Sequence, residues 1–88
     1  MNKNSLIKSL DFILNKGFCK RTIYRAWKEF KKIKPYLAEE DSELIYRCML
    51  YVDPDYPDYM PRDYYARQRF ASAVKQAKQH VMEKNNDV

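Results

Sequence analysis

The segment 20–37 carries the charged side chains of this chain that are best placed to bind a ligand. With about 100° between successive residues of a helix, the segment separates into an apolar face and a basic face. The apolar face consists of Ile23, Ala26, Trp27, Phe30, Ile33 and Leu37. The basic face consists of Lys20, Arg21, Tyr24, Arg25, Lys28, Lys31 and Lys32, with Glu29 at its margin. Cations at this density repel one another, so the basic face predicts an anionic partner.

Nucleic acid is the leading candidate for that partner. Lysine and arginine at helical spacing can follow a phosphate backbone, and Tyr24, Tyr64 and Tyr65 could stack on unpaired bases. The alternative is that the basic face is only solvated, or is neutralised by the rest of the chain. Residues 1–37 hold ten basic and two acidic side chains, whereas residues 38–63 hold two basic and eight acidic ones. The sequence leaves open whether the acidic middle folds back or forms a second surface for a different partner.

Residues 17–27 resemble part of a helix-turn-helix motif. In that motif a glycine precedes an apolar residue in the turn, and the next helix places apolar residues inward and polar residues outward. Gly17, Phe18, Ile23 and Ala26 stand at matching places. The resemblance implies that Lys20, Arg21, Tyr24 and Arg25 face a DNA groove.

The stretch 52–61 is the second unusual feature, because it combines three aspartates with three prolines and two tyrosines. A calcium loop would need a glycine and a closing glutamate, and neither is in place, so no metal site is expected. Rigid prolines beside tyrosines instead suit a protein contact, for which Tyr56, Asp58 and Tyr59 are the candidates. The alternative is a packed connector whose tyrosines cover the core.

The sequence Leu50-Tyr51-Val52-Asp53-Pro54, followed by Tyr56-Pro57, Pro61 and Arg67, looks like that of small proteins of large tailed phages. So does the tyrosine-rich composition with a single glycine. The resemblance implies either a virion component or a small early protein that binds a host macromolecule. A protein of the second kind acts by occupying a surface and not by catalysis.

No motif predicts an enzyme, a cofactor or a bound metal. The spacing of Cys19, Cys48 and His80 fits no zinc-ligand pattern, and no serine, histidine and acid arrangement indicates a catalytic site. The sequence also contains no evident signal peptide or membrane-spanning segment. We therefore expect a cytoplasmic protein with two free thiols, located in the host cytoplasm if a phage encodes it.

The chain of 88 residues is expected to form a single all-α domain, a compact bundle of three or four helices, with a frayed tail at 85–88. Periodicity predicts helices over about 5–16, 20–37, 42–51 and 61–84, with a loop between the last two. A buried strand over 45–52 is the alternative for the third segment. Asn4 or Ser5 is expected to cap the first helix, Asp41 or Ser42 the third, and Gly17 to end the first in a left-handed conformation. The predicted core is Leu10, Ile13, Leu14, Ile23, Trp27, Phe30, Leu44, Cys48, Phe70, Val74 and Val81.

The sequence thus predicts a small nonenzymatic protein whose basic face contacts nucleic acid. The runner-up is a phage-type protein-interaction module that inhibits a host protein or ribonucleoprotein complex by meeting an acidic surface. A homodimeric structural protein is the third interpretation.

Overall fold

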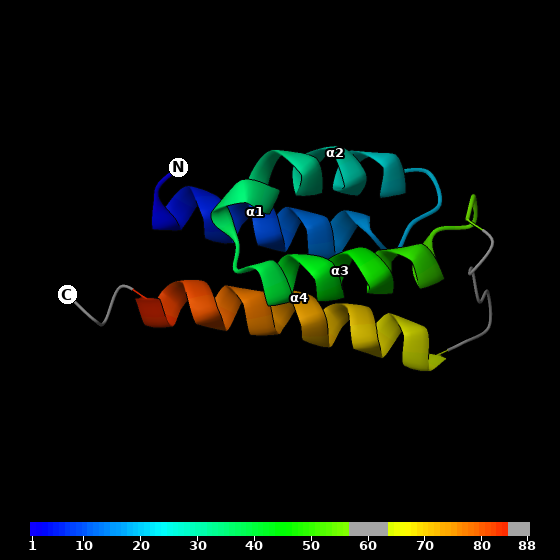
Figure 1. The fold of residues 1–88 in the computed structure, drawn as a ribbon. Helices are drawn as coiled ribbons and strands as arrows, with labels where there is room; N and C mark the ends of the chain where they lie inside the picture. Colours follow the sequence, from blue (N-terminus) through cyan, green and yellow to red (C-terminus); the bar gives the residue numbers. More distant parts are fainter. Residues whose placement is uncertain (57–63, 85–88) are drawn as a thin grey trace.

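The computed structural model of the chain describes residues 1–56 and 64–84, except for the side chain of Lys84. Its helices are α1 (Lys3–Lys16), α2 (Ile23–Ile33), α3 (Glu39–Val52) and α4 (Tyr64–Lys84), with a 3-10 helix η1 (Lys34–Tyr36) after α2. Consecutive helices run side by side in alternating directions (Figure 1). Because the described residues contain no strand, the prediction of an all-α bundle is confirmed, and the alternative strand over 45–52 is wrong.

The four helices enclose one hydrophobic core. α1 packs against both α2 and α4, and α3 packs against α4. Large aromatic side chains join α2 to α3, because the Trp27 ring of α2 meets the Tyr46 ring of α3 edge-on with their centroids 5.7 Å apart. The largest fully buried side chains are Phe30, Phe70, Leu10, Ile13, Ile33, Ile45, Met49 and Val74.

Most of the predicted core is confirmed, and one member is wrong. Leu14, Trp27 and Val81 are only partly buried and pack against the edge of the core. Leu44 is 38% exposed. The buried stripe of α3 runs through Ile45 and Met49, so Leu44 lies at its margin.

Several helix boundaries differ from the prediction. α1 begins two residues earlier, because the side chain of Asn2 accepts a hydrogen bond from the backbone N–H of Ser5 at 2.8 Å and caps the helix. α2 begins only at Ile23, so Lys20 and Arg21 lie in the preceding turn. α3 begins at Glu39, and three acidic residues in its first turn complement the helix dipole. The predicted start of α4 at Pro61 lies outside the described residues.

Gly17 ends α1, but not in the left-handed conformation that the sequence predicted. Its φ of −72° and ψ of −14° are right-handed, so a side chain would be allowed by the backbone alone. The space around it is the constraint. A Cβ placed on Gly17 would overlap Cε2 of Phe70, and it would lie 2.5 Å from Phe70 Cζ and 2.9 Å from the Ile13 carbonyl oxygen. Glycine therefore allows α4 to approach the end of α1.

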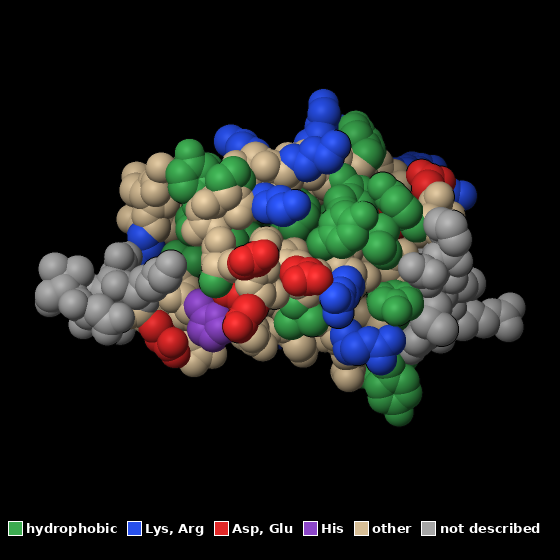
Figure 2. Space-filling model, in the orientation of Figure 1, with side chains coloured by type: hydrophobic (Ala, Val, Ile, Leu, Met, Phe, Trp, Pro, Cys, Tyr) green, Lys and Arg blue, Asp and Glu red, His purple; other side chains and the backbone are tan. Residues whose placement is uncertain are grey.

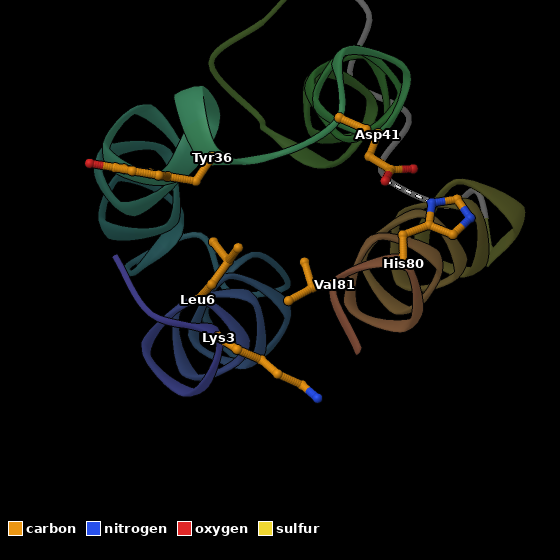
Figure 3. Close-up of a pocket in the computed structure, with 7 residues that line it drawn as sticks. Lys3, Leu6, Tyr36, Asp41, His80 and Val81 are labelled. Carbon is orange, nitrogen blue, oxygen red and sulfur yellow. Dashed lines mark hydrogen bonds and ion pairs between the residues drawn. The ribbon is translucent and has the colours of Figure 1, made fainter. Parts of the chain in front are cut away.

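A buried carboxylate links the start of α3 to the end of α4. The side chain of Asp41 is 2% exposed, and its Oδ2 lies 2.8 Å from Nδ1 of His80 (Figure 3). Its Oδ1 has no hydrogen-bond partner among the described residues. The pair borders a small cavity of about 160 Å³. The hydrogen bond to Asp41 and the negative charges of Asp41, Glu83 and Glu40 raise the pKa of His80 above its ordinary value of 6.5.

We expect this pair to make stability depend on pH. Because the pKa of His80 is higher in the folded state, its contribution is complete below pH 6.5 and is lost as the pH rises through the raised pKa. The melting temperature should therefore fall as the pH rises above about 6.5. His80 is the only histidine of the chain, so His80→Gln should flatten this part of the profile. A variant with an unchanged slope would contradict the assignment.

Candidate functional site

The basic face is displayed by α2 and by the turn before it. Arg25, Lys28, Lys31 and Lys32 lie on α2, Lys20 and Arg21 lie in the turn, and all six side chains are exposed. The turn is held by Thr22, whose hydroxyl donates to the carbonyl oxygen of Lys16 at 2.9 Å. The backbone N–H of Thr22 donates to the carbonyl oxygen of Cys19 at 3.0 Å. This local order fixes where the two turn cations emerge relative to α2.

None of the six cations forms an ion pair with another residue of the described ranges. Two acidic residues of α3 have other partners, because Asp41 pairs with His80 and Glu43 pairs with Arg47 at 2.8 Å. Glu29, at the margin of the basic face, accepts a hydrogen bond from the Ser9 hydroxyl of α1 at 2.6 Å. Figure 2 shows lysine and arginine side chains over α2, and acidic side chains below them, some of them beside the purple histidine.

Tyr24 is a polar aromatic member of this surface. Its side chain is 54% exposed, and Nε of Arg25 donates to its hydroxyl at 3.2 Å. That hydrogen bond and the positive charges of Arg25 and Lys28 lower the pKa of Tyr24. The same contact raises the pKa of Arg25, which therefore stays charged. The Tyr24 ring and the neighbouring cations Arg25 and Lys28 are thus held together on the basic face.

Beside the basic face lies an open pocket of about 430 Å³ that sequence reasoning missed. Trp27, expected in the core, forms part of its wall and is only partly buried. Indole Nε1–H donates to Oδ2 of Asp53, and backbone N–H of Asp55 donates to Oδ1 of the same carboxylate at 2.9 Å. Asp53, 3% exposed, therefore fixes both the indole and the turn that follows α3.

Of the residues predicted for a protein contact, the structure places only Tyr56. Its exposed ring lies against Trp27 with a centroid distance of 5.4 Å. Asp58 and Tyr59 lie outside the described residues. Tyr64 and Tyr65 lie at the start of α4, and the pocket that includes Tyr65 is lined by α3 and α4 without any residue of α2. The sequence predicted that Tyr24, Tyr64 and Tyr65 stack on bases. Of these three, only Tyr24 lines the pocket beside Trp27.

The Asp53 contacts predict a specific loss of stability. Asp53→Ala should lower the free energy of unfolding by about 1–3 kcal/mol, because two N–H groups lose a charged acceptor. Asp55→Ala is the matched control, since the Asp55 side chain is exposed and its backbone N–H remains. Chemical denaturation checks both. Trp27 is the only tryptophan, so its fluorescence also reports whether the indole has moved. Equal stability of the two variants would contradict this role of Asp53.

Both cysteines are free thiols in the structure. Cys19 is exposed in the turn before α2, and Cys48 is buried on α3. The backbone N–H of Arg21 and the hydroxyl of Thr22 lower the pKa of the Cys19 thiol, whereas burial raises that of Cys48. Within 1–56 and 64–84, no three His, Cys, Asp or Glu side chains gather as metal ligands would. None of the helices, as far as they are described, is both long and apolar enough to cross a membrane.

No protein-family model matches this chain, and searches of curated proteins and of solved structures find no significant match. Function is therefore inferred from the residues themselves.

Proposed function

We propose that this chain is a small nonenzymatic binding protein that contacts nucleic acid through its basic face. The observation that carries the proposal is that six exposed cations of α2 and its turn have no acidic partner among the described residues. Phosphate groups would supply the missing negative charge, and release of their counterions would favour binding.

Two further observations support the proposal. Two acidic residues near the start of α3, Asp41 and Glu43, pair with His80 and Arg47, so neither of them is an ion-pair partner of the basic face. Lys28 and Lys32 also stand four residues apart on α2, a spacing that brings like charges together. A partner that relieves this repulsion gains binding energy from it. The helix-turn-helix resemblance remains a prediction from the sequence, and the proposal stands on charge without it.

Direct binding tests the proposal. Fluorescein-labelled single-stranded and duplex oligonucleotides of equal length are titrated with the protein in about 50 mM salt, and binding is followed by anisotropy. We expect dissociation constants in the micromolar range or tighter, since non-specific binding at higher salt already reaches about 10⁻⁴–10⁻⁶ M. Binding to neither oligonucleotide would reject the proposal. A stoichiometric complex recovered from lysate after nuclease treatment would then favour the runner-up, an acidic surface of a host protein.

A further inference from the structure

The pocket beside Trp27 differs chemically from the basic face that it adjoins. Three aromatic rings and one aliphatic side chain form its apolar wall, and one cation and two carboxylates form its polar part. These residues are Tyr24, Trp27, Tyr56 and Ile23, with Lys31, Asp53 and Asp55. Its volume of about 430 Å³ lies within the range of about 300–1,000 Å³ found for sites that hold small molecules.

The aromatic wall is anchored on one side and open on the other. Trp27 is fixed by its hydrogen bond to Asp53 and by edge-on contacts with Phe30 and Tyr46, whose centroids lie 6.3 and 5.7 Å away. Tyr24 and Tyr56 instead expose 54% and 40% of their surface. The Tyr56 ring already lies 5.4 Å from the indole, so the exposed phenol rings, held in place by the fixed indole, are the surface on which a planar base can stack.

The carboxylates show which part of a nucleic acid this pocket suits. Negative charge at Asp53 and Asp55 repels a phosphate, so the backbone belongs on the cations of α2. The Asp53 oxygens already accept hydrogen bonds from Trp27 and from the Asp55 backbone. Asp55 is exposed at the pocket, where its carboxylate can accept N–H groups from a ligand. Lys31 lines the same pocket and supplies a donor.

Guanine matches this set of groups better than the other bases, because adenine and cytosine each place a ring-nitrogen acceptor, which a carboxylate repels, beside their one amino donor. Its Watson–Crick edge offers two adjacent donors, N1–H and the N2 amino group, which suit a carboxylate, and its O6 accepts from an ammonium group. Thymine and uracil present one donor between two carbonyl oxygens, and those oxygens repel a carboxylate. In a duplex this edge is paired and both faces of the base are stacked, so the base must be unpaired.

We propose that the Trp27 pocket binds an unpaired guanine of a single-stranded nucleic acid whose phosphates lie along the basic face. The inference rests on the proposed function, because the basic face holds the strand from which the base enters. Trp27, four residues before Lys31, stands where the apolar and basic faces of α2 meet. A strand bound on the cations therefore passes the mouth of the pocket.

Single-stranded 11-mers of thymidine test this assignment, with the central nucleotide replaced by deoxyguanosine, by deoxycytidine or by an abasic site. All carry the same number of phosphates, so differences in affinity report the central base. We expect the guanine strand to bind about tenfold more tightly than the deoxycytidine, abasic and all-thymine strands, as one stacked and hydrogen-bonded base allows. It should also quench the fluorescence of Trp27, the only tryptophan of the chain.

Asp55→Ala should remove the guanine preference while keeping affinity for the all-thymine strand. Glu40→Ala is the matched control, because it removes one exposed acidic side chain outside the pocket, and it should keep the preference. Equal salt-dependent affinity for all strands would overturn the guanine pocket and leave the proposed function standing. Binding of none of them would overturn both. A guanine preference that survives in Asp55→Ala would also overturn the assignment.

Discussion

Gly17→Ala is expected to lower the free energy of unfolding by about 1–3 kcal/mol, and Gly17→Val by more. The added Cβ would overlap the Phe70 ring and lie 2.9 Å from the Ile13 carbonyl oxygen. Phe70 is fully buried, and the Phe18 ring packs edge-on against it with a centroid distance of 5.2 Å. The ring therefore cannot move into solvent, so α4 must shift away from the end of α1. Such a loss is a large part of the stability of a domain of this size.

Urea denaturation of Gly17→Ala, Phe70→Leu and the double variant checks this explanation. If the overlap is the cause, the smaller Leu side chain should relieve it, and the double variant should be more stable than the sum of the two single effects indicates. Strictly additive effects would contradict the overlap and would point to the backbone of the turn instead.

Lys28→Gln combined with Lys32→Gln is expected to weaken nucleic-acid binding by on the order of 10- to 100-fold at about 100 mM salt, through the loss of two phosphate contacts. Both side chains are exposed on α2. The melting temperature should barely change, because two small effects oppose each other. Lost repulsion between charges four residues apart stabilises the helix, and a lost cation in its last turn destabilises it.

The control is Lys8→Gln with Lys75→Gln, which removes two exposed lysines from α1 and α4. Both double variants lower the net charge from +5 to +3. A difference in affinity between them therefore reports where the lysines lie and not how much charge was removed. Similar losses of affinity in the two variants would mean that net charge attracts the nucleic acid without a defined surface.

Periodicity was sufficient to predict the helices, because every described helix buries an apolar stripe. The start of α2 was not predictable in this way. Lys20 and Arg21 fit the helical pattern, but the Thr22 hydroxyl binds the Lys16 carbonyl oxygen and holds them in a turn. Gly17 illustrates the same limit, since its role depends on Phe70, which lies far along the sequence.

The basic face was visible in the sequence, whereas the pocket beside it was not. The position of the pocket depends on the hydrogen bond from Trp27 to Asp53, two residues that lie 26 positions apart in the sequence. The sequence did contain partial signals. A buried indole N–H requires an acceptor, and the run Asp53-Pro54-Asp55 favours a turn in which an aspartate accepts backbone hydrogen bonds. Which acceptor meets the indole depends on the packing of α2 against α3.

The salt dependence of binding tests the central claim most directly. The dissociation constant of a labelled oligonucleotide is measured between about 50 and 300 mM salt for the wild type and for the two double-lysine variants. Four to six phosphate contacts give a slope of about −3 to −5 for the logarithm of the association constant against the logarithm of the salt concentration. The slope should become shallower by about 1.5 in Lys28→Gln with Lys32→Gln and should stay unchanged in Lys8→Gln with Lys75→Gln. A wild-type slope near zero, or an equal change in both variants, would contradict phosphate binding by the basic face.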